Sequence, residues 1–379
     1  MLTIDKVKKA EHLLKDVIRK TDLIFAPDLA KNSEIYLKSE NLQKTGSFKV
    51  RGAYAKIARL SDEQKKKGII ACSAGNHAQG VALAAQKNGI QSKIFIPSTA
   101  PISKIEATKS YGAQICLVDG VYDDAYNEAV QCQQETGAEF IHPFDDIEVI
   151  AGQGTIALEV LEQLPEVEAV IVPIGGGGLI SGIAYTIKML KPECKVYGVQ
   201  AAGAGSMYYS IEHHKRTELP AVHTFADGTA VKMPGENTFA LCEKYVDKIV
   251  TVTDDEIATA VLTLMEHQKL VAEGAGALSV AAAMFKKLPI EGKKTVCIVS
   301  GGNIDVNILS RVINRGLLKS GRIADLTIEM LDKPGQLKEV SRIIADLGAN
   351  VIRVRHNQGG KEERAKPATP QTRILTIVT

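Results

Sequence analysis

Short apolar runs alternate with longer amphipathic stretches along most of this chain, and this alternation restricts the fold more than any other feature. The apolar runs lie at residues 68–71, 92–96, 113–118, 170–174 and 295–299. Stretches with helical periodicity follow them, at residues 76–87, 102–111, 122–135, 179–190 and 304–319. Strands that alternate with helices of this length are typical of βαβ units and parallel sheets. Because the strands are aliphatic without polar alternation, we expect sheets that are covered on both faces.

The pattern changes near Ser320, where residues 321–322 resemble a linker. Residues 325–330 then alternate like a strand with one exposed face, and residues 336–347 have helical periodicity that ends at a glycine. Residues 351–354 return to strand character. We therefore predict a large α/β region over residues 1–320 and a small α+β domain over residues 324–379.

Composition excludes several classes of function. The 379 residues are 45% hydrophobic and 24% charged, which is typical of a globular protein with a buried core. The net charge is only +2 and the signs are mixed, so nothing favours binding to nucleic acid or to an anionic membrane. The N-terminus lacks the apolar core of a signal peptide, and the longest apolar run, residues 169–184, is too short to span a bilayer. We expect a cytoplasmic protein.

The metal-binding residue types show no ligand spacing. The six cysteines are scattered without a CxxC pair, so we expect reduced thiols and neither a disulfide framework nor a zinc site. His213, His214 and His223 lie in a polar stretch, which favours a solvated loop, with a metal site as the alternative. We predict no metal.

Ligands of open α/β sheets bind at the carboxyl ends of the strands, so the loops there are the candidates for function. A first segment, residues 44–53 (KTGSFKVRGA), precedes a helix and contains Lys49 next to Phe48. A lysine in a loop is usually solvated. A lysine flanked by small residues and an aromatic ring at a helix start can instead be partly desolvated, which lowers its pKa and allows it to form a Schiff base.

Two further loops offer backbone N–H groups at helix starts. Residues 73–77 (SAGNH) follow a strand and suit a carboxylate, although Asn76 as a simple helix cap is the alternative. Residues 175–179 (GGGGL) allow close approach of an anion at a helix N-terminus, so we predict phosphate binding there, with a flexible linker as the alternative. The phosphate-loop motif of nucleoside triphosphate enzymes is not matched.

The fourth loop is residues 300–303 (SGGN), directly after an apolar strand. A hydroxyl at a strand end with glycines behind it is suited to contact a flat ring. A plain turn is the equal alternative for this loop taken alone.

The segments ENLQKTGSFKVRGA, SAGNHAQG, GGGGLISG and VSGGN, in this order, resemble those of the fold-type-II pyridoxal-phosphate enzymes, and specifically the threonine/serine dehydratases (threonine ammonia-lyases). The resemblance covers residues 1 to about 320. It implies two open twisted, mainly parallel sheets flanked by helices, with a small subdomain at about residues 48–145 inserted in the larger one. It also implies pyridoxal 5'-phosphate as cofactor and conversion of L-threonine to 2-oxobutanoate and ammonia, with L-serine to pyruvate as a second activity, in isoleucine biosynthesis or threonine catabolism.

The same resemblance implies roles for individual residues. Lys49 would hold the cofactor as a Schiff base and, once freed, remove the α-proton of the substrate. Phe48 would lie against the cofactor ring, Asn76 would form a hydrogen bond with the ring hydroxyl, and Ser300 would contact the pyridine nitrogen. The phosphate would be held by Gly175, Gly176, Gly177, Gly178 and Leu179. The substrate carboxylate would be surrounded by Ser73, Ala74, Gly75, Asn76 and His77. Two residues are similar to family residues near the ring, Gly228 and Glu273.

Other functions remain open within and outside the family. Serine racemases resemble the chain but carry serine where it has Ala74, and alanine cannot transfer a proton. Residues 200–206, which match a divalent-cation site of some relatives, contain no carboxylate here, so no cation is expected there. A hydroxyaspartate dehydratase stays open, and a non-catalytic amino-acid-binding regulatory protein is the alternative of another class.

Residues 324–355 resemble the first part of an ACT domain, a β-α-β-β-α-β ligand-binding module. The resemblance implies an amino-acid effector, isoleucine or valine, bound near residues 332–337, and a homodimer or homotetramer. Residues 374–378 are predicted to form a third strand, whereas the second helix and fourth strand have no room. The alternative is an incomplete domain that only supports oligomerisation.

Overall fold

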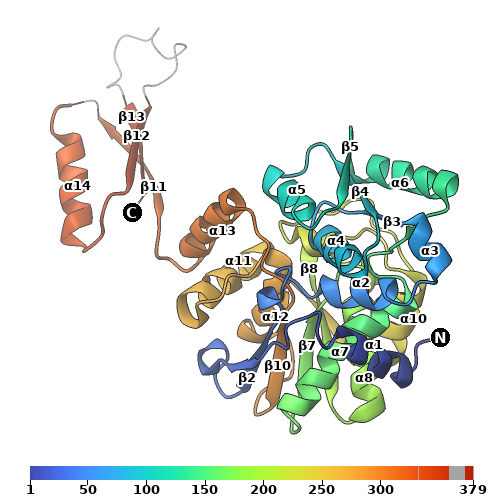
Figure 1. Cartoon of the computed structure of the whole chain (residues 1–379). Helices are drawn as coiled ribbons and strands as arrows, with labels where there is room; N and C mark the ends of the chain where they lie inside the picture. Colours follow the sequence, from blue (N-terminus) through green and yellow to red (C-terminus); the bar gives the residue numbers. More distant parts are fainter. Residues whose placement is uncertain (332, 358–371, 379) are drawn as a thin grey trace. The chain divides into compact units, whose positions relative to one another are not determined.

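The computed structural model describes residues 1–331, 333–357 and 372–378. The chain divides into two compact units, residues 1–310 and 311–379, coloured from blue to orange and from orange to red in Figure 1. The division falls within helix α13 (Val306–Lys319), whereas the predicted linker follows that helix.

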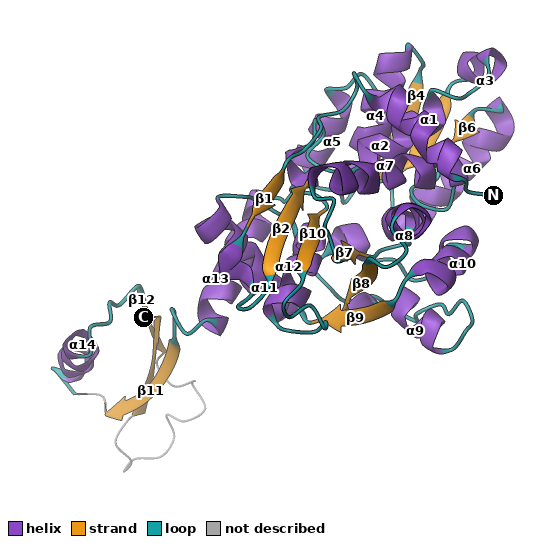
Figure 2. Ribbon diagram, turned by 90° about the horizontal axis from the view of Figure 1, so that it is seen from below, coloured by secondary structure: helices purple, strands orange, loops and turns teal. Residues whose placement is uncertain are grey.

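The larger sheet of the first unit has six strands in the order β1-β2-β10-β7-β8-β9. All neighbouring strands are parallel except β1 and β2. Their bounds are β1 (Leu23–Phe25), β2 (Glu34–Ser39), β7 (Ala169–Pro173), β8 (Lys195–Ala201), β9 (Lys248–Val252) and β10 (Lys294–Val299). β10, the last of these strands in the chain, thus lies in the interior of the sheet (Figure 2).

Helices cover this sheet on both sides, as its aliphatic strands predict. Figure 1 shows α11 (Asp254–Thr263) and α12 (Gly274–Met284) on one side of the sheet, and α7 (Ile147–Gln163) and α8 (Gly178–Leu190) on the other. The core between the sheet and α7 and α8 consists of buried aliphatic side chains, among them Ile156, Val170, Val172, Ile183 and Val196.

The smaller sheet has four parallel strands in the order β5-β4-β3-β6. The strands are β3 (Ile69–Cys72), β4 (Ser92–Pro97), β5 (Gln114–Val118) and β6 (Glu139–Phe140). Alternate residues of β3 face opposite cores: Ile69 packs with α2 (Lys49–Ile57) and α4 (Asn76–Asn88), while Ile70 packs with α6 (Tyr122–Thr136). The predicted α/β architecture with covered, mainly parallel sheets is confirmed, and the pair β1–β2 is its antiparallel exception.

The other helices of the first unit connect or flank these layers. They are α1 (Ile4–Leu14), α3 (Asp62–Lys67), α5 (Ile102–Lys109), α9 (Ser206–Glu212) and α10 (Glu236–Tyr245). Within the described residues, no helix is both long and apolar enough to cross a membrane, and no cluster of three or more His, Cys, Asp or Glu side chains is arranged to hold a metal ion. The six cysteines are free thiols.

The second unit contains a three-stranded antiparallel sheet in the order β11-β13-β12. Its elements are β11 (Asp325–Leu331), α14 (Gln336–Asp346), β12 (Arg353–Asn357) and β13 (Thr372–Val378). Ile344 of α14 is buried against Ile328, Val340 and Val351. The strand predicted at residues 374–378 is confirmed as part of β13, which is the central strand of this sheet. Residue 332 of the predicted effector turn lies outside the described residues, as do residues 358–371 and 379 of the predicted domain.

Candidate active site

The Lys49 segment is joined through its backbone to the loop that follows β10. The Phe48 amide donates to the Ser300 carbonyl at 3.1 Å, and the Gly302 amide donates to the Gly46 carbonyl at 2.9 Å. Gly46 has a φ of +69°, and a β-carbon on it would lie 2.3 Å from the side-chain oxygen of Asn303. A glycine is therefore needed at this position, and two of the four predicted loops form one structure.

Lys49 is the first residue of α2, at the position where the sequence predicts a helix start. Its Nζ donates a 2.8 Å hydrogen bond to the Pro143 carbonyl and lies 5.3 Å from the centroid of the Phe48 ring. Burial lowers the pKa of Lys49 to about 8, although the nearby Glu273 acts in the opposite direction. Lys49 is thus not a solvated loop lysine, and a substantial fraction of its amine is neutral near pH 8.

Asn76 does not cap α4, because the capping position is Gly75. Its side chain instead reaches across to two other loops. The Asn76 amide donates to Glu273 Oε1 at 2.5 Å, and its oxygen accepts a 2.8 Å hydrogen bond from Asn303. Asn303 also donates to the Thr45 carbonyl at 2.7 Å. These contacts determine the orientation of the Asn76 amide and exclude the simple capping role.

Glu273 precedes α12 and is buried. Burial, and next the negative charge of Asp227, raise the pKa of Glu273 to about 8. Its carboxyl group is consequently protonated at neutral pH and can act as a hydrogen-bond donor. A β-carbon on Gly301 would lie 2.3 Å from Glu273 Oε1, and one on Gly228 would lie 3.7 Å from it, so both glycines border this carboxyl group.

The tetraglycine loop connects β7 to α8 and is rigidly held. Gly177 has a φ of +99°, and a β-carbon on Gly176 would lie 2.4 Å from the Phe144 ring. Thr238 Oγ1 donates to the Gly176 carbonyl at 2.6 Å. Leu179, in the first turn of α8, is buried. The loop is therefore not a flexible linker, and it lies at the N-terminus of a 13-residue helix, where anions bind favourably.

Ser300 directly follows β10 and is buried. Its hydroxyl donates to the Ala275 carbonyl at 3.4 Å, which is near the upper limit of a hydrogen bond. Since this hydrogen bond is weak, the Ser300 hydroxyl can donate a shorter hydrogen bond to another acceptor.

The loop between β3 and α4 combines open space with a fixed backbone. Ser73 Oγ accepts a 3.2 Å hydrogen bond from the Gly75 amide, and a β-carbon on Gly75 would meet no atom within 4 Å. The Ala74 side chain packs against the core formed by α2, α4 and the small sheet. His77 is buried with Nε2 2.8 Å from the Ile141 carbonyl, and burial lowers its pKa to about 3. His77 is therefore neutral, and its ring lies in the core.

Sequence reasoning missed the segment 142–145 and the role of Asn303. The segment supplies the acceptor for Lys49 and the ring beside the glycine loop. It follows β6, whose two residues are too short for a recognisable strand pattern. Asn303 belonged to the SGGN loop, but only the structure shows that its side chain connects Thr45 to Asn76.

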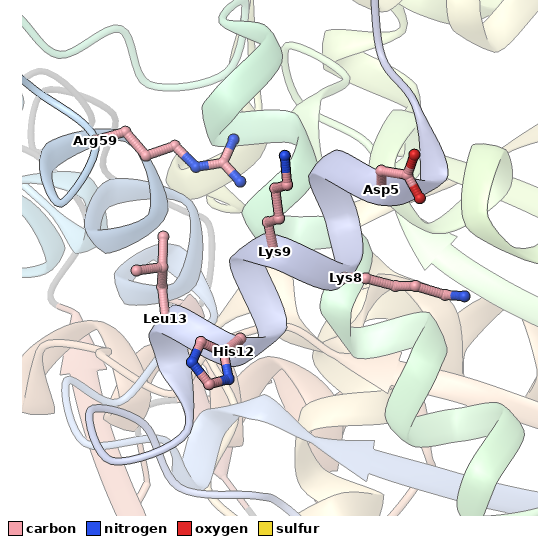
Figure 3. A pocket seen from close by; sticks show the side chains of 6 residues that line it. All are labelled: Asp5, Lys8, Lys9, His12, Leu13 and Arg59. Carbon is pink, nitrogen blue, oxygen red and sulfur yellow. The ribbon is translucent and has the colours of Figure 1, made fainter.

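A surface hollow of about 520 Å³ lies elsewhere on the first unit, along α1 and the end of α2. It is lined by Asp5, Lys8, Lys9, His12, Leu13 and Arg59 (Figure 3). Arg59 is paired with Glu148 and donates to the Lys6 carbonyl at 3.2 Å. The hollow shares no residue with the four loops, so it is separate from the candidate active site.

Comparison with known proteins identifies the class of protein to which this fold and these loops belong. A family model described as pyridoxal-phosphate dependent enzyme matches residues 14–301. The chain belongs to this family, and pyridoxal phosphate is its cofactor.

The relatives of this chain include both lyases and a racemase. An L-threonine ammonia-lyase from Thermotoga maritima is 53% identical over 364 residues, which cover 96% of this chain and 90% of that protein. The structure of threonine deaminase isoform 2 from Solanum lycopersicum has a TM-score of 0.79 at 38% identity, covering 83% of this chain and 88% of that chain. The structure of maize serine racemase has a TM-score of 0.78 at 36% identity, covering 84% of this chain and 99% of that chain.

The residues present fit pyridoxal phosphate chemically. An aldehyde needs an amine that is neutral part of the time, and the pKa of Lys49 is lowered to about 8. A phosphate needs N–H donors at a glycine-rich helix start, as at Gly178 of α8. A ring nitrogen needs a hydroxyl that can donate a hydrogen bond to it, as at Ser300.

Proposed function

We propose that this protein dehydrates and deaminates L-threonine to 2-oxobutanoate and ammonia, with L-serine to pyruvate as a second activity. The observation that carries the proposal is the partly buried Lys49 amine, whose pKa of about 8 suits a general base and whose charge acts on His77 of the loop with open space at Gly75. The 53% identity to the L-threonine ammonia-lyase of Thermotoga maritima supports this substrate.

The cofactor would be held from several sides. Lys49 would bind the aldehyde carbon, with Phe48 beside the ring and Ser300 at the ring nitrogen. The phosphate would take the backbone N–H groups of Gly175, Gly176, Gly177, Gly178 and Leu179. The remaining residues around the ring would be Asn76, Gly228 and Glu273. When bound, pyridoxal phosphate withdraws electrons from the substrate α-carbon and so stabilises the carbanion formed there.

The protein's own groups would then perform two tasks. Lys49 would accept the α-proton on its neutral Nζ, and the Pro143 carbonyl would orient this amine through the 2.8 Å hydrogen bond. The loop of Ser73, Ala74, Gly75, Asn76 and His77 would bind the substrate carboxylate with backbone N–H groups at the start of α4. His77 would contribute only its backbone, because its neutral ring is hydrogen-bonded through Nε2 to the Ile141 carbonyl.

Racemisation needs a second proton donor on the opposite face of the α-carbon. In this chain the loop carries Ala74, whose methyl group packs against the core. A methyl group cannot transfer a proton, so elimination is favoured over racemisation despite the structural similarity to maize serine racemase.

The test is a steady-state comparison of L-threonine and L-serine by formation of 2-oxo acid, together with chiral analysis of the remaining serine. Efficient 2-oxo acid formation without D-serine is the expected result. D-serine formation faster than pyruvate formation would assign the chain to the racemases instead. A cofactor-loaded protein that turns over neither amino acid would support a binding function.

For residues 324–379 we propose an ACT-like regulatory role with isoleucine or valine as effector, in a homodimer or homotetramer. The strand order β11-β13-β12 with α14 on one face supports this, because it is compatible with the first four elements of a β-α-β-β-α-β module. Adding isoleucine or valine to the steady-state assay tests the effector, and light scattering tests the assembly. Unchanged rates at saturating effector would leave only the alternative role in oligomerisation.

A further inference from the structure

The His142 side chain forms a tight turn with the residues that follow it. Its Nδ1 accepts hydrogen bonds from two backbone amides, at 3.3 Å from Phe144 and at 2.8 Å from Asp145. The His142 ring also lies edge-on to the Phe144 ring, with 4.7 Å between centroids. Burial lowers the pKa of His142, so Nδ1 keeps the lone pair that both amides need at neutral pH.

This turn directs three consecutive residues to different parts of the site. The Pro143 carbonyl accepts the 2.8 Å hydrogen bond from Lys49 Nζ. The Phe144 ring occupies the place where a Gly176 side chain would be. The Asp145 carboxylate accepts from the Thr238 amide at 3.1 Å, and Thr238 in turn donates to the Gly176 carbonyl. The segment 142–145 therefore touches the lysine on one side and the glycine loop on the other.

We propose that His142 is a positioning residue that sets the spacing between the Lys49 amine and the tetraglycine loop. The inference rests on the proposed roles of these two elements, which would bind opposite ends of one cofactor molecule. A rigid ligand can satisfy both ends only if their separation is fixed beforehand, and preorganisation of this kind raises affinity without a new contact. His142 itself would touch neither cofactor nor substrate.

Two variants separate the acceptor from the ring. His142→Asn keeps a side-chain oxygen that can accept from the amide two residues ahead, as in an Asx turn, but removes the ring. His142→Phe keeps a ring against Phe144 but has no acceptor. Should His142→Phe not fold, His142→Gln replaces it, because its acceptor is one methylene too distant for the turn and the same loss is expected. Circular dichroism and thermal melting establish that each variant is folded.

The readout is binding of pyridoxal phosphate and of pyridoxal, which lacks the phosphate, to cofactor-free protein, followed by absorbance and fluorescence. The affinity for pyridoxal phosphate divided by the affinity for pyridoxal reports whether the aldehyde end and the phosphate end of the cofactor are held at once. In His142→Phe this ratio should fall by about tenfold, the size of one lost hydrogen-bonded contact, while in His142→Asn it should stay within about threefold. An unchanged ratio in His142→Phe, or an equal loss in His142→Asn, would overturn the proposal.

Borohydride reduction and peptide mapping of the labelled wild-type protein keep this result distinct from the proposed function. A label on a lysine other than Lys49 contradicts the proposed function, whatever the His142 variants do. A label on Lys49 together with an unchanged affinity ratio in His142→Phe overturns only the role of His142.

Discussion

Asn76 and Glu273 are 197 residues apart in the chain, yet the Asn76 amide donates a 2.5 Å hydrogen bond to the Glu273 carboxyl group. Because Asn303 donates to the Asn76 oxygen, the Asn76 nitrogen must face Glu273. The contact joins the loop of residues 73–77, which follows β3 of the small sheet, to the start of α12, which packs on the large sheet. A protonated carboxyl group is thereby held at a defined place beside the candidate substrate loop.

The first prediction concerns Lys49. Lys49→Ala should abolish the absorbance of lysine-bound pyridoxal phosphate and reduce 2-oxo acid formation by at least about a thousandfold, because both Schiff-base formation and α-proton removal are lost. Lys44→Ala is the matched control, since Lys44 lies in the same segment but is exposed. Remaining turnover in Lys49→Ala would remove Lys49 from its role.

The raised pKa of Glu273 predicts a pH dependence of stability. In cofactor-free protein, the ordinary pKa of 4.5 rises to about 8 on folding, so the unfolded chain loses this proton first. The stabilisation from this group is complete below about pH 4.5 and is lost as the pH rises to about 8. Glu273→Gln, which resembles the protonated form, should lack this loss.

Urea unfolding of wild type and Glu273→Gln at about pH 5.5 and about pH 7.5 measures this difference, because other titrating groups cancel in the comparison. The wild type should lose stability relative to the variant between the two values. A difference in the free energy of unfolding that does not change with pH would show that Glu273 is ionised in the folded protein.

A buried charge network near the active site predicts a large effect on stability. Arg51, fully buried, binds Glu40 through Nε and Glu159 through Nη1, at 2.8 and 2.6 Å. Arg51→Met would leave the buried Glu40 carboxylate without its ion-pair partner and Glu159 with Lys38 alone, so the free energy of unfolding should fall by about 3–5 kcal/mol. Arg342→Ala, which breaks the exposed pairs with Glu339 and Asp346 on α14, should leave the free energy of unfolding nearly unchanged.

Urea titration followed by circular dichroism gives both values. Arg51→Lys should lie between wild type and Arg51→Met, since lysine keeps the charge but not the planar fork that serves two carboxylates. A loss below about 1 kcal/mol in Arg51→Met would mean that water replaces the guanidinium.

The last prediction concerns Ala74. Ala74→Ser should introduce measurable conversion of L-serine to D-serine, because Ala74 is only partly buried and a hydroxyl would then be available on the loop that is proposed to bind the substrate. Chiral chromatography of serine after incubation with the variant measures it, with wild type in parallel. If D-serine stays at the wild-type level, a hydroxyl at this position is insufficient for proton transfer to the α-carbon.

Part of the fold was predictable because several of its strands are strongly apolar on both faces. The runs at 68–71 and 295–299 correspond to β3 (Ile69–Cys72) and β10 (Lys294–Val299). The edge strand β1 and the two-residue β6 were not predictable, since they are short and their residues are only partly buried. Helix α7 was missed as well, because it carries Gly152 and Gly154 where it closely approaches its neighbours.

The site was predictable as four loops but not as one network. Lys49 and the tetraglycine loop have recognisable local patterns, and the structure puts both at the starts of helices. The contacts of Pro143, Phe144 and Asn303 depend on pairs far apart in sequence, for which a single sequence carries no signal. Only the three-dimensional arrangement shows which atom faces the lysine.

The pairing of the Lys49 segment with Gly301 and Gly302 also has a consequence in time. A ribosome makes the chain from the N-terminus at about 5–20 residues per second, so these partners of the Lys49 segment appear roughly 13–50 seconds after the segment itself. Strand β10, which must enter the large sheet between β2 and β7, is made in the same late interval. Newly made protein should therefore be unable to take up its cofactor until translation has passed Gly302. During this interval the large sheet lacks β10, and chaperones can protect its exposed strands.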